Sequence, residues 1–301
     1  MMSTRVGTDI AEAARLLSAG GVVAMPTETV YGLAALARDA DAVRRVYSIK
    51  GRPLDHPLIV HVANEEAARE WAGSWSPTAD ALAKRFWPGP LTLIVERADF
   101  VPDFVTGGRP TVALRVPSHP LAIELLRRVD DGLAAPSANR FGRVSPTTAE
   151  HVRNDLGDDV DYVLDGGACD VGVESTIVDC SVDPPQILRP GGVAREDIEA
   201  VVRTLAPMSG PSRAPGMLDS HYAPNCRVVL RETDDESEPR SSGATRALDA
   251  SVDPSSFARD MYAHLRNADS DGIETLVITL PAPHGIGLAI RDRLRKAAAQ
   301  R

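Results

Sequence analysis

An apolar run that changes abruptly into polar residues limits the fold of this chain more than any other feature. Residues 22–25 are apolar and are followed at once by Pro-Thr-Glu-Thr-Val-Tyr-Gly-Leu. The run predicts a buried strand, and ligands of α/β proteins bind where such strands end. Thr29 is therefore a candidate for recognising a small polar ligand, with Tyr31 as a flat wall. The alternative is a turn closed by local side-chain bonds of Thr27 and Glu28.

Further apolar runs and helical periods extend this pattern through the first 205 residues. Strands are predicted at residues 22–25, 58–62, 91–96, 111–116, 133–135, 162–164 and 176–179. Helices are predicted after Asp9 and at residues 41–49, 65–71, 78–86, 120–129 and 146–156. Because strands and helices mix without strict alternation, we expect an α/β fold with a mixed, twisted sheet and flanking helices.

A segment dense in proline and glycine, residues 206–225, divides the chain, because this composition prevents a continuous helix or a central strand. We expect it to link a catalytic domain, residues 1–205, to a small C-terminal domain, residues 226–301. There, strands near 227–230 and 275–280 and helices near 257–267 and from 286 predict a Rossmann-like α/β arrangement. The polar composition of residues 232–256 is typical of disorder.

The net charge of −9 argues against a surface devoted to nonspecific nucleic-acid binding, because such a surface needs clustered cations. A local basic pocket is compatible with this charge. The three cysteines are too few for a disulfide framework and lack the spacing of a zinc site. The sequence has no apolar run suited to a signal peptide or a membrane span, so we expect a cytoplasmic protein with reduced thiols.

Lys50 and Arg52 follow the helix predicted at 41–49, and Pro53 and Pro57 stiffen the chain around them. Two long cationic side chains held in this way suit phosphate binding. The alternative is a solvated position at the helix C-terminus, where the helix dipole favours cations.

Arg115 lies in a mostly apolar predicted strand, where an unpaired guanidinium is costly to desolvate. It must therefore reach water, an internal carboxylate or an anionic ligand, and a carboxylate ligand matches its fork best. A surface ion pair at the strand end is the alternative. His61 lies in another apolar run and is either a ligand-binding residue or a core histidine with both ring nitrogens bonded.

Neutral hydrogen-bonding side chains surround two other predicted strand ends. One group lies before or at the start of the helix predicted from Pro146 and consists of Ser137, Asn139, Ser145 and Thr147. These side chains would present donors to phosphate or ribose oxygens. The alternative for Ser145 is that it only caps that helix. Ser175 precedes the strand at 176–179. Arg189 precedes paired glycines that allow a close approach to phosphate. Plain loops are the alternative in both places.

Taken in order, these segments resemble one family. The matching motifs are PTETVYGL, KGRP, HPLIVHV, WPGPLTLIV, TVALRVPSHP, APSANRFGRVSPT, GVESTIVD, ILRPGG and PGMLDSHYAP. Together they resemble the threonylcarbamoyl-adenylate synthases of the YrdC-like class. The last motif and residues 226–301 resemble the longer branch, in which a linker with His-Tyr-Ala-Pro joins the catalytic domain to a small α/β domain.

The resemblance implies a nucleotidyltransferase that joins L-threonine, bicarbonate and ATP into threonylcarbamoyl-adenylate, releasing pyrophosphate, for tRNA modification completed by partner proteins. It implies Mg²⁺ bound with ATP, without a nameable protein ligand, and Lys50 and Arg52 as catalytic cations. The threonine-binding positions would be Thr29, His61, Arg115, Ser137 and Ser175. The nucleotide-binding positions would be Lys50, Arg52, His56, Thr111, Asn139, Thr147, Arg189 and Tyr222.

Two positions depart from the family pattern: His56 stands where asparagine is common, and Phe141 replaces a usual serine. Two other functions stay open at this point. One is an RNA-binding module without turnover, and the other is a carbamoyl-adenylate enzyme with a different acceptor.

Overall fold

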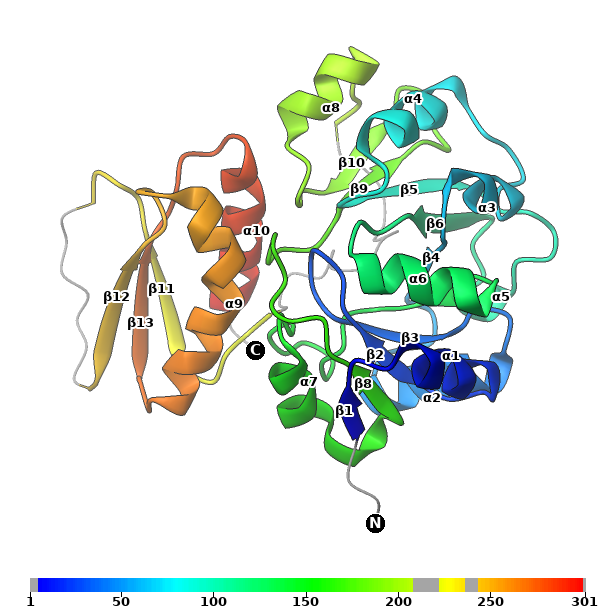
Figure 1. Cartoon of the computed structure of the whole chain (residues 1–301). Helices are drawn as coiled ribbons and strands as arrows, with labels where there is room; N and C mark the ends of the chain where they lie inside the picture. Colours follow the sequence, from blue (N-terminus) through cyan, green and yellow to red (C-terminus); the bar gives the residue numbers. More distant parts are fainter. Residues whose placement is uncertain (1–4, 208–221, 236–242, 300–301) are drawn as a thin grey trace.

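The computed structural model describes residues 5–207, 222–235 and 243–299, and a ten-stranded mixed sheet is its largest element (Figure 1). In spatial order the strands are β1 (Arg5–Gly7), β8 (Tyr162–Leu164), β2 (Val23–Met25), β3 (Gly32–Leu36), β7 (Leu133–Ala134), β4 (Ile59–His61), β6 (Thr111–Arg115), β5 (Leu91–Glu96), β9 (Thr176–Asp179) and β10 (Gln186–Arg189). Each neighbouring pair among β2, β3, β7 and β4 is antiparallel, whereas β4 and β6 are parallel. The mixed α/β sheet predicted from the sequence is confirmed.

Helices flank this sheet (Figure 1). They are α1 (Ile10–Ser18), α2 (Ala40–Lys50), α3 (Glu65–Glu70), α4 (Pro77–Phe86), α5 (Asp103–Thr106), α6 (Pro120–Val129), α7 (Ala149–Leu156) and α8 (Arg195–Val202), and a short 3-10 helix, η1 (Gly157–Asp159), follows α7. The start predicted for α7 was wrong. Thr148 caps this helix by accepting a hydrogen bond from the His151 backbone N–H, and Ser145 lies outside it.

The register of β4 and β6 decides which side chains meet over the sheet. His61 pairs directly with Arg115, and Ile59 pairs with Ala113. Because side chains alternate along a strand, Ile59 and His61 face one side of the sheet and Val60 faces the other, in the main apolar core. His61 and Arg115 thus become neighbours although they are distant in the sequence.

A second sheet of three parallel strands carries the C-terminal part of the chain. Its strands are β11 (Arg227–Arg231), β13 (Thr275–Thr279) and β12 (Thr245–Asp249), in that order, and its helices are α9 (Pro254–Ser270) and α10 (Ile286–Ala298). In Figure 1 both helices stand between the small sheet and the rest of the molecule. The predicted small α/β unit is confirmed.

Several strands escaped prediction for identifiable reasons. β12 lies within the polar segment 232–256 and alternates between exposed and half-buried residues, so it carries little apolar signal; residues 236–242 of that segment lie outside the described residues. β3 is buried along most of its length and rich in small residues, so it lacks the period-two alternation of a half-buried strand. β1 and β10 are short and begin with polar residues.

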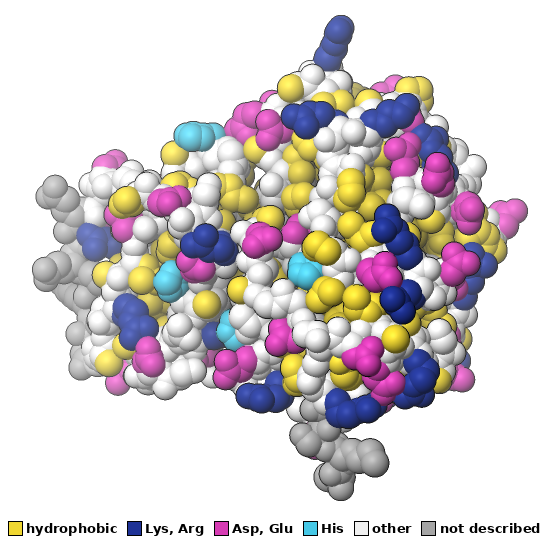
Figure 2. All heavy atoms as spheres, in the orientation of Figure 1, with side chains coloured by type: hydrophobic (Ala, Val, Ile, Leu, Met, Phe, Trp, Pro, Cys, Tyr) yellow, Lys and Arg dark blue, Asp and Glu magenta, His cyan; other side chains and the backbone are white. Residues whose placement is uncertain are grey.

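Apolar side chains join the two parts of the molecule. One buried cluster combines Val30, Val144 and Val173 of the larger part with Met261 and Leu265 of α9. On the face drawn in Figure 2, cationic and acidic side chains are interspersed over both parts. Within the described ranges, no helix has the length and apolarity needed to cross a bilayer.

Candidate active site

A cavity lies over the sheet face that carries Ile59 and His61. It encloses about 610 Å³ of empty space, including the solvent at its mouth. It is lined by Thr27, Thr29, Val30, Gly32, Lys50, Arg52, Ile59, His61, Arg115, Ala135, Pro136, Ser137, Glu174, Ser175, Arg189 and Tyr222. The lining includes four cations and one carboxylate, so the cavity is strongly basic inside an acidic molecule.

The loop after β2 shapes one side of this cavity. The Thr27 hydroxyl lies 2.9 Å from that of Thr29, accepts hydrogen bonds from the backbone N–H groups of Thr29 and Val30, and donates to the Val30 carbonyl. These bonds close the local turn that the sequence offered as an alternative, and the turn holds Thr29 in the lining. Tyr31 does not form a wall, because its hydroxyl donates to the Gly167 carbonyl outside the lining.

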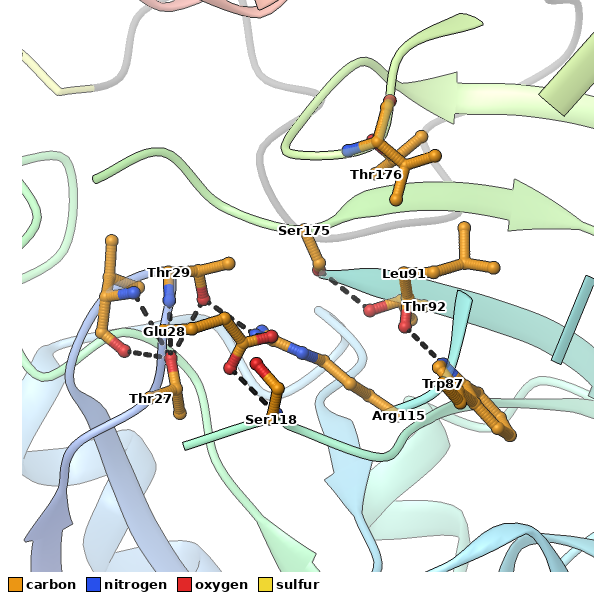
Figure 3. A network of polar contacts seen from close by, with 12 residues as sticks. Thr27, Glu28, Thr29, Trp87, Leu91, Thr92, Arg115, Ser118, Ser175 and Thr176 are labelled. Carbon is orange, nitrogen blue, oxygen red and sulfur yellow. Dashed lines mark hydrogen bonds and ion pairs between the residues drawn. The ribbon is translucent and has the colours of Figure 1, made fainter. Parts of the chain in front are cut away.

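Arg115 is buried and bonded to this loop (Figure 3). Its Nη2 atom lies 2.8 Å from Glu28 Oε1 and 2.9 Å from the Thr29 hydroxyl. Glu28 is itself held by the backbone N–H of Ser118, 3.1 Å away. The Nε atom of Arg115 is buried and has no hydrogen-bond partner among the described residues. The guanidinium thus pairs with an internal carboxylate and still has an N–H group that can bind a ligand. The alternative of a surface ion pair is excluded.

His61 lies beside Arg115 in the β4–β6 register. Burial, and then the charge of Arg115, lower the pKa of its imidazole to about 3, so the ring is neutral at physiological pH. Its Nδ1 atom is buried and unbonded in the part of the chain that the structure describes. A core histidine with both nitrogens bonded is therefore excluded, and a polar atom is left for a ligand.

Lys50 is the last residue of α2 and is almost fully buried. Its Nζ atom donates to the carbonyl oxygens of Ser137 at 2.5 Å and Asn139 at 2.6 Å. Burial, and then the charge of Arg52, lower its pKa well below the ordinary value. A solvated position at the helix end is excluded, and the ammonium instead fixes the loop that carries Ser137.

Arg52 is another cation of the cavity lining. Its Nη2 atom donates to the Pro57 carbonyl at 3.1 Å, and its guanidinium lies 5.9 Å from the ring centroid of Phe141. Burial lowers its pKa to about 10, which still leaves it charged at neutral pH. Its Nε atom is buried without a hydrogen-bond partner in the described ranges.

Ser175 and Arg189 also line the cavity and are bonded to each other. The Ser175 hydroxyl lies 2.8 Å from that of Thr92 (Figure 3), and Arg189 Nη2 lies 3.0 Å from both the hydroxyl and the carbonyl oxygen of Ser175. Tyr222, at the end of the predicted linker, is 1% exposed and also lines the cavity. His221 beside it lies outside the described residues.

The structure brings every residue predicted for threonine into one cavity, but only part of the nucleotide set. His56 is half-buried in the loop before β4, with its ring 5.7 Å from that of Phe141. Thr111 lies at the opposite end of β6 from Arg115. Asn139 and Thr147 are buried behind the lining, and the Oδ1 atom of Asn139 has no partner among the described residues.

Comparisons with known proteins identify the family. A family model described as "Telomere recombination" matches residues 15–191, and one described as "Threonylcarbamoyl-AMP synthase, C-terminal domain" matches residues 193–299. The threonylcarbamoyl-AMP synthase of Pyrococcus abyssi is 39% identical over 320 residues, covering 96% of this chain and 94% of that protein. The chain belongs to the threonylcarbamoyl-AMP synthase family.

Two further relatives extend this result. The threonylcarbamoyl-AMP synthase of Bacillus subtilis is 39% identical over 97% of this chain and 93% of its own length. The crystal structure of P. abyssi Sua5 complexed with L-threonine superposes with a TM-score of 0.89 at 35% identity, covering 99% of this chain and 97% of that one. The family resemblance inferred from the ordered motifs is confirmed over both parts of the molecule.

Sequence reasoning missed two C-terminal residues that reach the wall of the cavity. Arg293 of α10 lies 2.7 Å from Glu174, which lines the cavity, and the hydroxyl of Tyr262 of α9 also bonds to Glu174. Ser145, predicted as a helix cap or a ligand-binding residue, donates to Glu174 Oε1 at 2.7 Å. The contact between Arg293 and Glu174 spans 119 positions, so it leaves no local pattern that single-sequence reasoning could detect.

The described residues do not form a protein-held metal site. They contain no group of three His, Cys, Asp or Glu side chains suited to hold a metal ion. The acidic residues at the cavity, Glu28 behind the lining and Glu174 within it, are each paired with an arginine. A hard cation such as Mg²⁺ needs several oxygen ligands, and the carboxylates here are already occupied by guanidinium groups.

Proposed function

We propose that this chain is a nucleotidyltransferase that forms threonylcarbamoyl-AMP and pyrophosphate from L-threonine, bicarbonate and ATP. The observation that carries the proposal is a basic cavity whose lining combines a guanidinium beside an unbonded imidazole nitrogen with three further cations, all within the described residues. Such a cavity matches two anionic reactants that must be held next to one another.

The threonine would lie on the side of Arg115. The carboxylate of threonine would accept hydrogen bonds from those N–H groups of Arg115 that do not bind Glu28. The hydroxyls of Thr29, Ser137 and Ser175 would contact the other polar groups of threonine. The neutral ring of His61 would use its unbonded nitrogen for the same ligand. A neutral ring adds a hydrogen bond without adding repulsion to the amino acid's ammonium.

The nucleotide would contact Lys50, Arg52, Arg189 and Tyr222, which all line the cavity. Three cations suit a triphosphate, and the aromatic ring of Tyr222 offers a surface for stacking or covering. We keep His56, Thr111, Asn139 and Thr147 as outer nucleotide contacts. Of these, Thr111 is the least favourable, because it lies at the far end of the five-residue strand β6 from Arg115.

In the proposed reaction the threonine amine and bicarbonate give a carbamate with loss of water, and a carbamate oxygen then attacks the α-phosphorus while pyrophosphate leaves. Lys50 and Arg52 would stabilise the charge that develops on the phosphate oxygens. A covalent step through cysteine is disfavoured, because burial raises the pKa of both Cys169 and Cys180 to about 12 and neither lines the cavity. Alignment of the reactants is the main contribution of the protein.

Other parts of the function follow from the family resemblance. Mg²⁺ would enter on the nucleotide, since its ligands would be phosphate oxygens and water. The product would be used by partner proteins that modify tRNA, and a cytoplasmic location stays a prediction. We also propose the domain limits 1–205 and 226–301, with residues 206–225 as the linker.

The decisive experiment is the mass of the product after incubation with all three substrates. Threonylcarbamoyl-AMP is expected only in the complete mixture, and omission of threonine or bicarbonate should abolish it. Turnover without threonine would favour a different acceptor. RNA affinity without any turnover would favour a binding module, although the interspersed charges in Figure 2 and the net charge of −9 do not support one.

A further inference from the structure

A buried arginine from the C-terminal part of the chain is built into the wall of the cavity. Arg293 of α10 has a fully buried side chain. Its Nε atom donates to Glu174 Oε2 at 2.7 Å, and its Nη1 atom donates to the carbonyl oxygen of Pro190 at 3.0 Å. Glu174 lines the cavity next to Ser175, and Pro190 follows Arg189 directly. Arg293 therefore holds the neighbours of two predicted substrate-binding residues.

Glu174 is bonded from both parts of the molecule. The Tyr262 hydroxyl lies 2.9 Å and 2.8 Å from its two oxygens, and the Ser145 hydroxyl donates to Oε1 at 2.7 Å. Burial alone would raise the pKa of this carboxyl, but Arg293 and then Arg189 lower it to about 2. Glu174 is thus an anion at neutral pH, and two guanidinium groups lie close enough to act on it.

The same two C-terminal residues also contact Tyr222. The guanidinium of Arg293 lies 5.4 Å from the Tyr222 ring centroid, and the ring of Tyr262 lies 5.6 Å from it. Both tyrosine rings belong to the apolar cluster that joins the two parts of the molecule. Arg293 and Tyr262 therefore each touch two residues of the cavity lining, Glu174 and Tyr222, without lining the cavity themselves.

We propose that Arg293 is a positioning residue of the active site, which neutralises Glu174 from the C-terminal domain and so leaves Arg189 directed at the nucleotide. The inference deepens the proposed function, on which it rests through the role given to Arg189. It assigns a task to the C-terminal domain: this domain supplies the counter-charge for an acidic residue inside a cavity that must receive anions.

The loss of Arg293 has a specific consequence. Glu174 would stay buried as a carboxylate, and Arg189 would be the remaining arginine that acts on it most strongly. A buried charge without its partner is strongly unfavourable, so the two groups would be drawn together. Arg189 would then leave its bonds to Ser175 and its place at the nucleotide. Neutralising Glu174 at the same time removes the cause of this displacement.

The test compares Arg293→Gln with Arg291→Gln in the full chain. Arg291 is a matched control, because it lies on the same helix, is also buried, and bonds to Glu232 and to the Pro281 carbonyl within the C-terminal domain. We expect Arg293→Gln to raise the KM for ATP and the calorimetric Kd for ATP by about tenfold or more. The KM for threonine should change by less than about threefold, and Arg291→Gln should leave both substrates within about twofold of wild type.

A double variant, Glu174→Gln with Arg293→Gln, sharpens the test. We expect it to bind ATP within about threefold of the wild type, since no buried carboxylate then competes for Arg189. If Arg293→Gln does not fold, Arg293→Lys replaces it. The lysine keeps the charge but loses the forked contact to Glu174 and Pro190, so an intermediate Kd for ATP is expected.

Equal effects of the Arg293 and Arg291 variants, or a folded double variant that binds ATP no better than Arg293→Gln, would overturn the role of Arg293. The binding measurement needs no turnover, so a wild-type protein that binds ATP but makes no product contradicts the proposed function alone. A wild type without ATP affinity contradicts the role of Arg189 and that of Arg293 with it.

Discussion

Two buried arginine–glutamate pairs contribute to the cavity, and the roles of cation and carboxylate are exchanged between them. In the Arg115–Glu28 pair the cation lines the cavity and the carboxylate lies behind it. In the Arg293–Glu174 pair the carboxylate lines the cavity and the cation lies behind it. The first pair lies within the larger part of the molecule, whereas the second joins the two parts. The first pair therefore needs only the larger part of the molecule, and the second depends on a residue of the C-terminal part.

The largest expected effect comes from breaking the first pair. Arg115→Ala removes the cation proposed to bind the threonine carboxylate and leaves Glu28 buried without its partner. We expect the KM for threonine to rise by about two orders of magnitude and the free energy of unfolding to fall by about 3–5 kcal/mol, while the KM for ATP changes far less. Steady-state kinetics with each substrate varied in turn, together with urea unfolding, would measure both.

Arg97→Ala is a suitable control for this experiment. Arg97 pairs with Asp103 and with the Val101 carbonyl away from the cavity, so its loss should leave both KM values unchanged. An Arg115 variant whose defects in threonine and ATP use are equal would contradict the assignment of this pair to the amino acid.

The pH dependence of stability should distinguish His61, which lies beside the first pair, from Glu174 of the second pair. The folded-state pKa of His61, about 3, lies below its ordinary value of 6.5, so between these values the unfolded chain binds a proton that the folded protein does not. Stability is therefore lost as the pH falls below 6.5, by about 3 kcal/mol at pH 4.5. The pKa of Glu174 is lowered from 4.5 to about 2, so its contribution is present above pH 4.5 and is lost only as the pH falls toward 2.

Urea unfolding of the wild type and of His61→Asn at several pH values tests this separation. The variant should lose about 3 kcal/mol less than the wild type between pH 8 and 4.5, and the two curves should run parallel once the pH falls below about 3, where Glu174 still titrates. His151, whose pKa is lowered to about 4, titrates in both proteins and cancels in the difference. Parallel curves over the whole range would show that folding does not lower the pKa of His61.

The first pair was within reach of sequence reasoning, and the second was not. An arginine in an apolar strand must have an anionic partner or reach water, and this requirement limits Arg115 to a few arrangements from the sequence alone. Glu28 lies in the polar motif that follows the first buried strand. Arg293 lies on an amphipathic helix where a charged residue is ordinary, and nothing in its neighbourhood indicates that it is buried against a residue 119 positions away.

The fold, like the two ion pairs, could be predicted from the sequence only in part. Helices with a clear apolar period, such as α6 and α10, were predicted at or near their observed starts. Two kinds of strand were not predicted: those without alternation, such as β3, and those with few apolar residues, such as β12. The stability of such strands comes from neighbours that the local sequence does not reveal. Thr148 rather than Ser145 caps α7, because the helix begins at Ala149, and the Ser145 hydroxyl donates to Glu174 instead.

A smaller effect is expected at Lys50, which lines the cavity and has no carboxylate partner in the described part of the chain. Lys50→Met keeps the volume but removes the charge and leaves the carbonyls of Ser137 and Asn139 without this donor. We expect the KM for ATP to rise by about tenfold, with a loss of about 1–3 kcal/mol in stability and a small change in the KM for threonine. Lys84→Met, at an exposed pair with Asp80, is the control. Equal rises in both KM values would contradict a phosphate-binding role.

The smallest effect should come from Tyr262→Phe, which removes one hydrogen bond to Glu174 and leaves the Arg293–Glu174 ion pair in place. Glu174 keeps its bonds to Arg293 and Ser145 and loses one hydroxyl donor, so we expect a loss of about 1 kcal/mol in stability and a rise of about fivefold in the KM for ATP. Tyr162→Phe removes a hydroxyl that accepts from the Asp9 backbone N–H away from the cavity lining, and it should change stability alone.

The comparison of these two phenylalanine variants isolates the link between the domains. Both remove one hydroxyl from a buried ring, so a purely structural role predicts the same kinetics for both. If the KM for ATP rises only in Tyr262→Phe, the carboxylate at the cavity wall depends on donors from the C-terminal domain. If it rises in neither, Glu174 does not need the Tyr262 hydroxyl, and the second pair resembles the first in relying on one guanidinium.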